Sequence, residues 1–282
     1  MRLARIGVRG AEVPVLLDGN GYLDLRSLTA DLDGPFLADR GLARVADAVE
    51  HGVLPRLNAP VDARVGAPVA RPSAVYGIGL NYTGQAVESG ASPPEEPIVF
   101  LKPPNTVTGP YDEVRIPRRS ERTDWEVELG IVIGARASYL ETPADALDHI
   151  AGFVVVNDVT EREWQLVESG GQWSKGKSAP DFCPVGPWLV TPDEVAYCAL
   201  RLQSWVNGEP RQDSTTGDLV YGVEFLVWHL SQYATLEPGD LILTGTPEGV
   251  ALSGRFPYLR AGDTVECEIE GLGRQRQRFV PA

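Results

Sequence analysis

Short apolar runs separated by turn-forming residues dominate the chain and predict a strand-rich fold. Beyond residue 68 they lie at 75–80, 97–102, 126–134, 152–159, 200–208, 240–245 and 263–271. Segments with helical spacing are fewer, at 143–150, 159–168 and 221–234. Because strands outnumber helices and are irregularly spaced, the pattern favours a β-rich α+β fold over a repeating βαβ sheet.

The first part of the chain has its own pattern, which predicts a small N-terminal α+β domain. Strand-like runs at 13–17 and 22–25 meet across the turn DGNG, which is typical of a hairpin. A helical stretch at 42–52 ends in Gly52. The next residues are rich in proline and lack periodicity, so we expect domains at 1–68 and 69–282.

The strand-like stretch TDWEVELGIVIG, residues 123–134, places two carboxylates on one face. With a period of two, Trp125 and three aliphatic residues point to one side, and Glu126, Glu128 and Gly130 point to the other. Neighbouring like charges in an apolar strand repel each other and lose hydration, so a positive group should lie between them. Gly130 leaves space on the same face. The alternative is that Glu126 and Glu128 form the solvated face of an edge strand.

Asp158 adds a third carboxylate, at the end of the strand GFVVVND. Ligands are often displayed where strands end in loops. Three carboxylates without a histidine describe a site for a hard cation, Mg²⁺ or Mn²⁺, with Ca²⁺ as a third option and Zn²⁺ disfavoured. His51, His149 and His229 all lie in helix-like segments remote from this motif, so we do not expect them to be ligands.

Composition and charge narrow the classes of function. A chain of 282 residues that is 43% hydrophobic can bury a sizeable core. Acidic residues outnumber basic ones by 39 to 25 and no basic patch appears, which argues against nucleic acid and anionic membranes as partners. No apolar run is long enough to span a membrane, and the start lacks a signal-peptide core. Three cysteines without metal-like spacing fit a reducing cytoplasm.

Six motifs in order along residues 75–278 resemble the fumarylacetoacetate hydrolase family. They are GLNY (79–82), PIVFLKPPN (97–105), DWEVELGIVIG (124–134), NDVTEREWQ (157–165), QWSKGKS (172–178) and LILTGTPEGV (241–250). The form GGQWSKGKS followed by PVGPWLVT is most similar to a bacterial branch acting on acylpyruvates and 2,4-diketo-3-deoxy sugar acids. The resemblance implies a mixed β-roll catalytic domain, a homodimer and a small 2-oxo or 2,4-dioxo acid as substrate.

The resemblance also implies roles for single residues. Glu126, Glu128 and Asp158 match the ligands of a divalent cation, Mg²⁺ or Mn²⁺, that chelates the substrate. Cleaving the C–C bond of a β-diketone leaves an enolate, which the cation and an ammonium group can stabilise. Lys177 matches the family lysine, and Lys175, two residues earlier, is the alternative.

Three further residues match family positions that contact the substrate: Arg162, Gln165 and Thr246. Arg162 and Gln165 are three apart on a predicted helix and therefore share a face. An arginine suits an oxo acid because it can bind a carboxylate through two hydrogen bonds. From the residues alone, the alternative for Arg162 is an ordinary charge on a helix surface, and the alternative for Thr246 is a turn after a buried strand.

Residues 79–90 resemble the family's mobile lid, with one departure. The family pattern NYxxHxxE carries a His–Glu pair that activates water. Glu88 is in place, but Gln85 stands at the histidine position. A glutamine can orient water but cannot take its proton, and general-base help is worth about 10²–10⁴-fold in rate. The glycines at 79, 84 and 90 suit either a hinge or a plain loop.

Three functions therefore compete. The leading expectation is a metal-dependent hydrolase that cleaves a C–C bond in a 2,4-diketo acid. Gln85 favours a lyase or isomerase in the same pocket, because decarboxylation of an oxaloacetate-type acid or keto–enol isomerisation needs no activated water. The third expectation is a non-catalytic relative that binds an oxo acid or serves as a dimeric scaffold.

Overall fold

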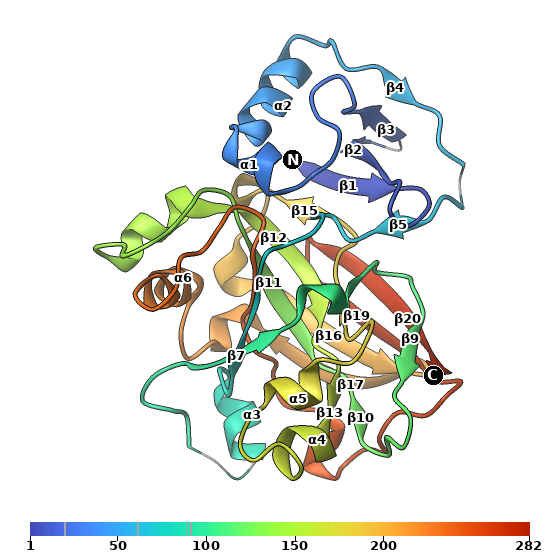
Figure 1. Ribbon diagram of the computed structural model, residues 1–282, viewed down its shortest axis with the longest axis vertical. Helices are drawn as coiled ribbons and strands as arrows, with labels where there is room; N and C mark the ends of the chain where they lie inside the picture. The colour runs from blue at the N-terminus through green and yellow to red at the C-terminus, as the bar shows by residue number, and fades with distance from the viewer. Residues whose placement is uncertain (20, 61, 89, 91) are drawn as a thin grey trace.

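The fold is built from two β-sheets with a few short helices around them, as Figure 1 shows. The computed structural model describes residues 1–19, 21–60, 62–88, 90 and 92–282. Asn20 of the expected DGNG turn and Ser89 of the lid-like segment lie outside the described residues. Strands outnumber helices, as the apolar pattern predicts.

The larger sheet has eleven strands within the described residues. In order across the sheet they are β4 (Arg56–Leu57), β3 (Gly21–Asp24), β2 (Val13–Asp18), β1 (Arg2–Ile6), β15 (Leu189–Val190), β12 (Ile150–Asn157), β11 (Val127–Ile133), β18 (Leu241–Leu243), β6 (Val75–Gly79) and β7 (Ile98–Lys102), with β5 (Val65–Gly66) beside β1. Strands β18 and β6 pair in parallel and all other neighbouring strands of this sheet are antiparallel, so the sheet is mixed.

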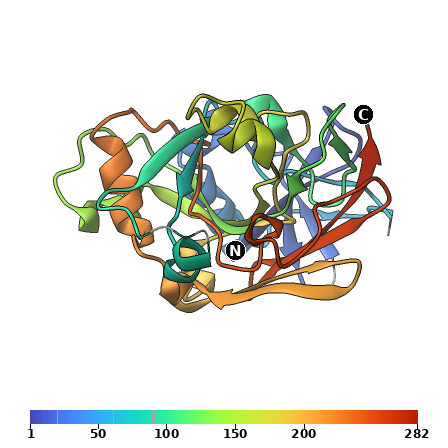
Figure 2. The ribbon, with the colours of Figure 1, turned by 90° about the horizontal axis from the view of Figure 1, so that it is seen from below.

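The second sheet has five strands. In order they are β17 (Glu209–Thr215), β16 (Arg201–Val206), β19 (Thr264–Ile269), β20 (Gly273–Pro281) and β9 (Val114–Ile116). Two short ladders complete the strands: β10 (Thr123–Asp124) with β13 (Thr160–Glu161), and β14 (Cys183–Pro184) with β8 (Val107–Thr108). In Figure 2 the orange and red strands of this sheet lie on the side of the molecule opposite helices α4 and α5.

The helices are short. The α-helices are α1 (Gly34–Ala38), α2 (Gly41–Glu50), α3 (Thr83–Glu88), α4 (Arg162–Leu166), α5 (Ser174–Lys177) and α6 (Val223–Ser231). The 3₁₀ turns are η1 (Pro104–Thr106), η2 (Pro143–His149), η3 (Pro192–Glu194), η4 (Tyr197–Ala199), η5 (Thr216–Asp218) and η6 (Ala251–Ser253).

Strand β11 is buried on both faces, which explains its apolar sequence. Leu129 and Ile131 belong to a core shared with the five-stranded sheet, whereas Val132 belongs to a core shared with the N-terminal strands. Gly130 leaves no empty space, because a Cβ there would lie 2.6 Å from Val154 and 2.7 Å from Val156. The space that the sequence suggested at Gly130 is thus filled by valine side chains of β12.

Two expected helices differ from the structure. The segment 143–150 forms the 3₁₀ turn η2, and helix α4 begins at Arg162 rather than at residue 159. The later start follows from Thr160, which pairs with Asp124 in a short ladder, and from Glu161, whose side chain caps α4 by accepting from the Trp164 N–H. Asp158 therefore lies between the end of β12 and β13, at a tight turn in which the Val159 N–H donates to the Asn157 carbonyl at 2.9 Å.

The N-terminal strands join the same sheet as the rest of the chain. Strand β1 pairs with β15, so the sheet continues across the predicted domain boundary near residue 68. Helix α2 ends at Glu50, and Gly52 follows it with φ of +62°, as the helical stretch predicts. The boundary itself stays a prediction.

Candidate active site

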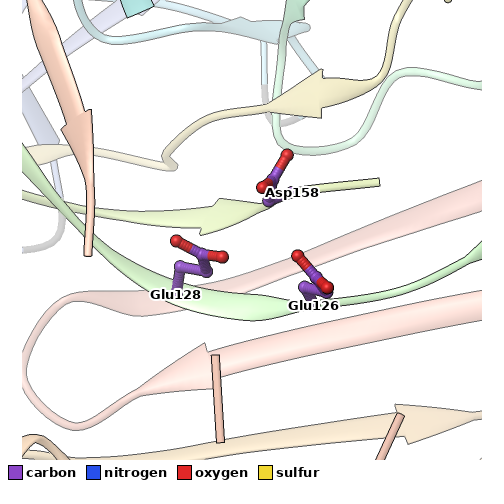
Figure 3. Close-up of side chains that lie close together, drawn as sticks. All are labelled: Glu126, Glu128 and Asp158. Carbon is purple, nitrogen blue, oxygen red and sulfur yellow. The ribbon is translucent and has the colours of Figure 1, made fainter. Parts of the chain in front are cut away.

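Three carboxylates from neighbouring strands meet at one end of β11 and β12. Glu126, Glu128 and Asp158 each offer an oxygen within 4.8 Å of the others, and their side chains converge in Figure 3. Strand pairing sets this arrangement, since Glu128 lies opposite Val156 and the Asp158 N–H donates to the Glu126 carbonyl at 2.9 Å. Strand β11 lies between β12 and β18, and all three side chains are buried. The edge-strand alternative is therefore wrong.

Lysines supply the positive charge that the paired glutamates require. Lys177 Nζ lies 2.6 Å from Glu126 Oε2 and 2.6 Å from Asp158 Oδ2. Lys102 Nζ lies 2.6 Å from the other Asp158 oxygen, and both lysines are 1% exposed. Lys175 is exposed and only approaches the Glu168 carbonyl, at 3.5 Å. The structure thus brings Lys177, not Lys175, to the carboxylates.

Burial and charge act differently on the pKa values of Glu128 and Asp158. Burial raises the pKa of Glu128 well above its ordinary value, and the charges of Asp158 and Glu126 raise it further. Burial also acts to raise the pKa of Asp158, but Lys102 and Lys177 outweigh it, so that pKa is lowered. A bound cation therefore competes with a proton for Glu128.

The donor set fits a hard divalent cation. Glu126, Glu128 and Asp158 would hold it through carboxylate oxygens, the ligands that Mg²⁺ and Mn²⁺ prefer. With Asp124 these groups carry four negative charges when ionised, against three positive charges from Lys102, Lys177 and Arg162. A divalent cation would change the net charge of these groups from −1 to +1. That balance suits a site that also receives an anionic substrate.

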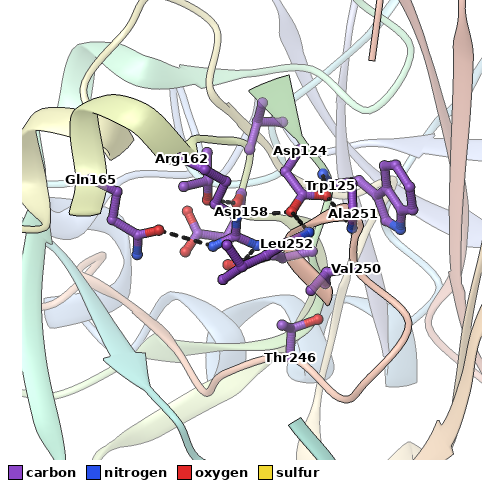
Figure 4. A network of polar contacts seen from close by, with 12 residues as sticks. Asp124, Trp125, Asp158, Arg162, Gln165, Thr246, Val250, Ala251 and Leu252 are labelled. Atoms are coloured by element: carbon purple, nitrogen blue, oxygen red, sulfur yellow. Dashed lines mark hydrogen bonds and ion pairs between the residues drawn. The ribbon is translucent and has the colours of Figure 1, made fainter. Parts of the chain in front are cut away.

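Arg162 is held by protein groups, and Figure 4 shows its contacts with Asp124 and Gln165 as dashed lines. Its Nε donates to Asp124 Oδ2 at 2.8 Å, and its Nη2 lies 2.6 Å from Glu126 Oε1. Its Nη1 donates to Gln165 Oε1 at 3.0 Å. In this arrangement the guanidinium orients Glu126 and Gln165. Direct contact between Arg162 or Gln165 and a substrate stays a prediction.

Asp124 connects this network to Ala251 and Leu252, at the start of η6. Its carboxylate accepts from the Ala251 N–H at 2.9 Å and from the Leu252 N–H at 3.0 Å. The side chain is fully buried, so these bonds and Arg162 satisfy its charge. Leu252 is thereby fixed beside the site.

Thr246 lies beside the carboxylates and is held by its neighbours. Its hydroxyl donates to the Val127 carbonyl at 2.9 Å and accepts from Gln212 Nε2 at 2.7 Å. The Gly245 N–H donates to Glu128 Oε2 at 2.7 Å, so this turn also orients a proposed ligand. A substrate contact by Thr246 stays a prediction.

Helix α3, which belongs to the lid-like segment, covers the site. Gln85 is 6% exposed, and Glu88 accepts from the Gly249 N–H at 2.9 Å and from Arg255 Nη1 at 3.1 Å. Gly84 permits close docking, because a Cβ there would lie 2.1 Å from Glu248 Oε2. In this conformation α3 is therefore fastened to the loop that follows β18.

All the residues proposed from the sequence except Asp158 line one cavity of about 320 Å³. Sequence reasoning assigned no role to Lys102, Asp124 or the apolar side chains that complete this cavity. Lys102 lies in the motif PIVFLKPPN and Asp124 in the motif DWEVELGIVIG. Their positions in these motifs are the sequence signal that could have identified them as site residues. Their partners, Asp158 and Arg162, come from distant parts of the chain.

Comparison with known proteins agrees with this architecture. Residues 74–280 match the family described as fumarylacetoacetate (FAA) hydrolase C-terminal. A Burkholderia cenocepacia protein, named as a candidate hydrolase without a substrate, is 47% identical over 283 residues, covering 99% of this chain and 98% of its own. Within the described residues no helix is both long and apolar enough to cross a membrane.

Three solved structures cover the whole of this chain. They are fumarylacetoacetate hydrolase from Exiguobacterium antarcticum (31% identity, TM-score 0.86, 100% of that chain), 5-carboxymethyl-2-hydroxymuconate delta-isomerase from Mycobacterium smegmatis (33%, 0.79, 99%) and maleylpyruvate hydrolase from Sphingobium sp. SYK-6 with manganese(II) and pyruvate (28%, 0.81, 100%). These matches confirm the expected β-rich fold class, and the chain belongs to the fumarylacetoacetate hydrolase family.

Proposed function

We propose that this protein is a divalent-metal-dependent hydrolase that cleaves a C–C bond in a 2,4-diketo acid of the acylpyruvate or diketo-deoxy sugar acid type. The observation that carries the proposal is the buried cluster of Glu126, Glu128 and Asp158, with Lys177 between two of them, in a cavity. The similar maleylpyruvate hydrolase binds manganese and pyruvate, a 2-oxo acid, which supports Mn²⁺ or Mg²⁺ as the cofactor, with Ca²⁺ as a third option.

Hydrolysis requires water to add to the carbonyl carbon C4 and the C3–C4 bond to break. The bonding electrons move to C3 and the neighbouring carbonyl as an enolate, which takes a proton at C3 to give a 2-oxo acid, while the acyl part leaves as a second acid. A divalent cation, when bound, supplies Lewis-acid polarisation of the substrate oxygens. Lys177 has three N–H donors and uses two on Glu126 and Asp158, so one remains for the enolate oxygen.

Water activation falls to the lid residues. Gln85 orients the water by hydrogen bonds, and the Glu88 carboxylate is the proton acceptor on the same helix. Because Glu88 is held by Gly249 and Arg255, proton transfer requires α3 to adjust when substrate enters. Arg162 and Gln165 position Glu126 and the substrate carboxylate.

Gln85 specifically favours a second candidate function, decarboxylation or keto–enol isomerisation in the same cavity. These reactions need an electron sink but no general base for water, and Gln85 cannot accept a proton. The similar delta-isomerase from Mycobacterium smegmatis shows that relatives of this fold are named for isomerisation as well as hydrolysis.

The test is a substrate panel assayed with Mg²⁺ or Mn²⁺ and with chelator. It includes acylpyruvates, diketo sugar acids, fumarylacetoacetate and oxaloacetate, and products are identified by mass because hydrolysis and decarboxylation leave different acids. We expect metal-dependent release of a 2-oxo acid from an acylpyruvate. Full activity in chelator refutes the metal site, CO₂ release without diketone cleavage favours the second candidate, and binding without turnover favours a non-catalytic relative.

We also propose that the protein is a homodimer in the cytoplasm. The family resemblance supports the dimer, and three free cysteines support a reducing compartment. Light scattering on the purified protein tests the first point, and cell fractionation tests the second.

A further inference from the structure

Six apolar side chains line the cavity that holds Glu126 and Glu128, and together we call them the tail wall. It consists of Ile78, Leu80, Phe100, Leu166, Trp173 and Leu252. These side chains come from β6, the segment after it, β7, α4, the loop before α5, and η6. A substrate whose 2-oxo acid head lies at the three carboxylates would extend its remaining carbon atoms along this wall.

The aromatic part of the tail wall is held in place by two glycines of β6. A Cβ at Gly77 would lie 2.2 Å from the Phe100 ring, and a Cβ at Gly79 would lie 2.2 Å from the Trp173 ring. The centroids of the two rings are 6.0 Å apart. Because both rings are seated against backbone, the wall is formed before any ligand enters.

No unpaired cation faces the tail among the described residues that line the cavity. The lining cations are Arg162 and Lys177, and each is already paired with carboxylates. Glu88, which also lines the cavity, is an anion. A second carboxylate at the end of a substrate would therefore lose hydration without gaining a partner.

We propose that the tail wall selects 2,4-diketo acids with an apolar acyl tail over those that end in a second carboxylate or a polyol. This inference rests on the proposed function, because the three carboxylates fix where the head lies. Burial of apolar surface favours each added methylene by about fourfold, and the unpaired charge disfavours a dicarboxylate by about tenfold or more.

The test uses binding, so that it does not depend on turnover. Calorimetry on the Mn²⁺-loaded protein compares 2-oxoheptanoate with 2-oxoheptanedioate, two acids that share a head and chain length and differ in the terminal group. We expect the monoacid to bind at least about tenfold more tightly. Equal or tighter binding of the diacid overturns the inference, whether or not acylpyruvates are hydrolysed.

A pair of variants tests whether the tail wall causes the preference for the monoacid. Leu166 lines the cavity and is 47% exposed, so Leu166→Arg can fold while presenting a free cation to the tail. We expect this variant to reverse the preference and bind the diacid more tightly. Val167→Arg is the matched control, because Val167 is 63% exposed and does not line the cavity. An unchanged preference in Leu166→Arg, or a reversal in both variants, refutes the role of the wall.

The outcomes separate this inference from the proposed function. If the monoacid is preferred but no diketo acid is cleaved, the hydrolase proposal falls and the tail selection stands. If acylpyruvates are cleaved but the diacid binds best, the hydrolase proposal stands and the tail selection falls. If neither acid binds the Mn²⁺-loaded protein, the tail selection falls and the substrate panel decides the hydrolase proposal.

Discussion

Replacing Lys177 with methionine tests both the electrostatics and the chemistry of the site. The change keeps a long side chain but removes an ammonium that lies 2.6 Å from two buried carboxylates. Removing one partner of a buried ion pair costs about 3–5 kcal/mol. Because Glu126 keeps Arg162 and Asp158 keeps Lys102, we expect the metal-free protein to lose an amount near the lower limit, about 3 kcal/mol.

The same change should slow turnover more than it weakens binding. Loss of one donor to a developing oxyanion typically lowers kcat by about 10²–10³-fold, and the effect on KM should be much smaller because the bond strengthens in the transition state. Saturating Mn²⁺ should reduce the stability loss, since the cation supplies charge near the carboxylates. Denaturant unfolding with and without Mn²⁺ measures the first effect, and steady-state kinetics on an acylpyruvate measures the second.

Lys175→Met is the control, because the exposed Lys175 side chain lies outside the carboxylate cluster. Its effect on stability should stay within about 0.5 kcal/mol. A Lys177→Met enzyme with normal kcat, or a larger loss in Lys175→Met, would refute the reasoning. The ion pairs around Glu126 would then have no role in catalysis.

Four further predictions concern the lid and the metal site. Gln85→His should raise hydrolysis by about 10-fold or more and leave decarboxylation nearly unchanged; if it adds nothing and Glu88→Gln abolishes hydrolysis, Glu88 alone is the base. Because the pKa of Glu128 is raised well above 4.5, a proton competes with the cation, so Mn²⁺ affinity measured by calorimetry should rise by up to about tenfold per pH unit below that raised pKa and level off above it. The same shift means that Glu128 makes the metal-free protein less stable as pH rises through this window, which unfolding curves can check. Lys102→Met, which removes an ion pair from Asp158, should weaken Mn²⁺ binding by about 10–100-fold in the same calorimetry, and unchanged affinity would exclude Lys102 from orienting this ligand.

The sequence was most informative where local pattern and chemistry coincide. Glu126 and Glu128 alternate with apolar residues at the start of β11, and Asp158 directly follows β12, which pairs with β11, so their meeting follows from strand geometry. The orientation of Arg162 was not predictable, because its partner Asp124 reaches it only through tertiary contacts. Similarly, Gly130 suggested space for a ligand, but the valines that fill it belong to another strand.

The composition of the tail wall was likewise not predictable from the sequence. Phe100, Trp173 and Leu252 lie far apart in the chain and have no shared periodicity. Only the docking of their segments around β6 places them on one cavity. A single sequence therefore indicates the reacting head of a substrate much better than its tail.

The position of β18 in the large sheet has a consequence for how the chain folds. This strand lies between β11 and β6, and Leu241 pairs with Val75, so the sheet closes only when segments from both ends of the chain meet. Such long-range pairing is slow because the entropy of closing a large loop is lost before the contacts form. During synthesis the unpaired edges of β6 and β11 therefore stay open to aggregation until β18 emerges.

The cation site should mature when β18 joins the sheet. The Gly245 N–H that orients Glu128 and the Thr246 hydroxyl that bonds Val127 both follow β18 directly. In refolding followed by tryptophan fluorescence, we expect Mn²⁺ capture to coincide with the slowest phase. Capture in an earlier phase would show that the three carboxylates are ordered before the sheet closes. A chain cut short before β18 would thus be left with open strand edges and an unfinished metal site.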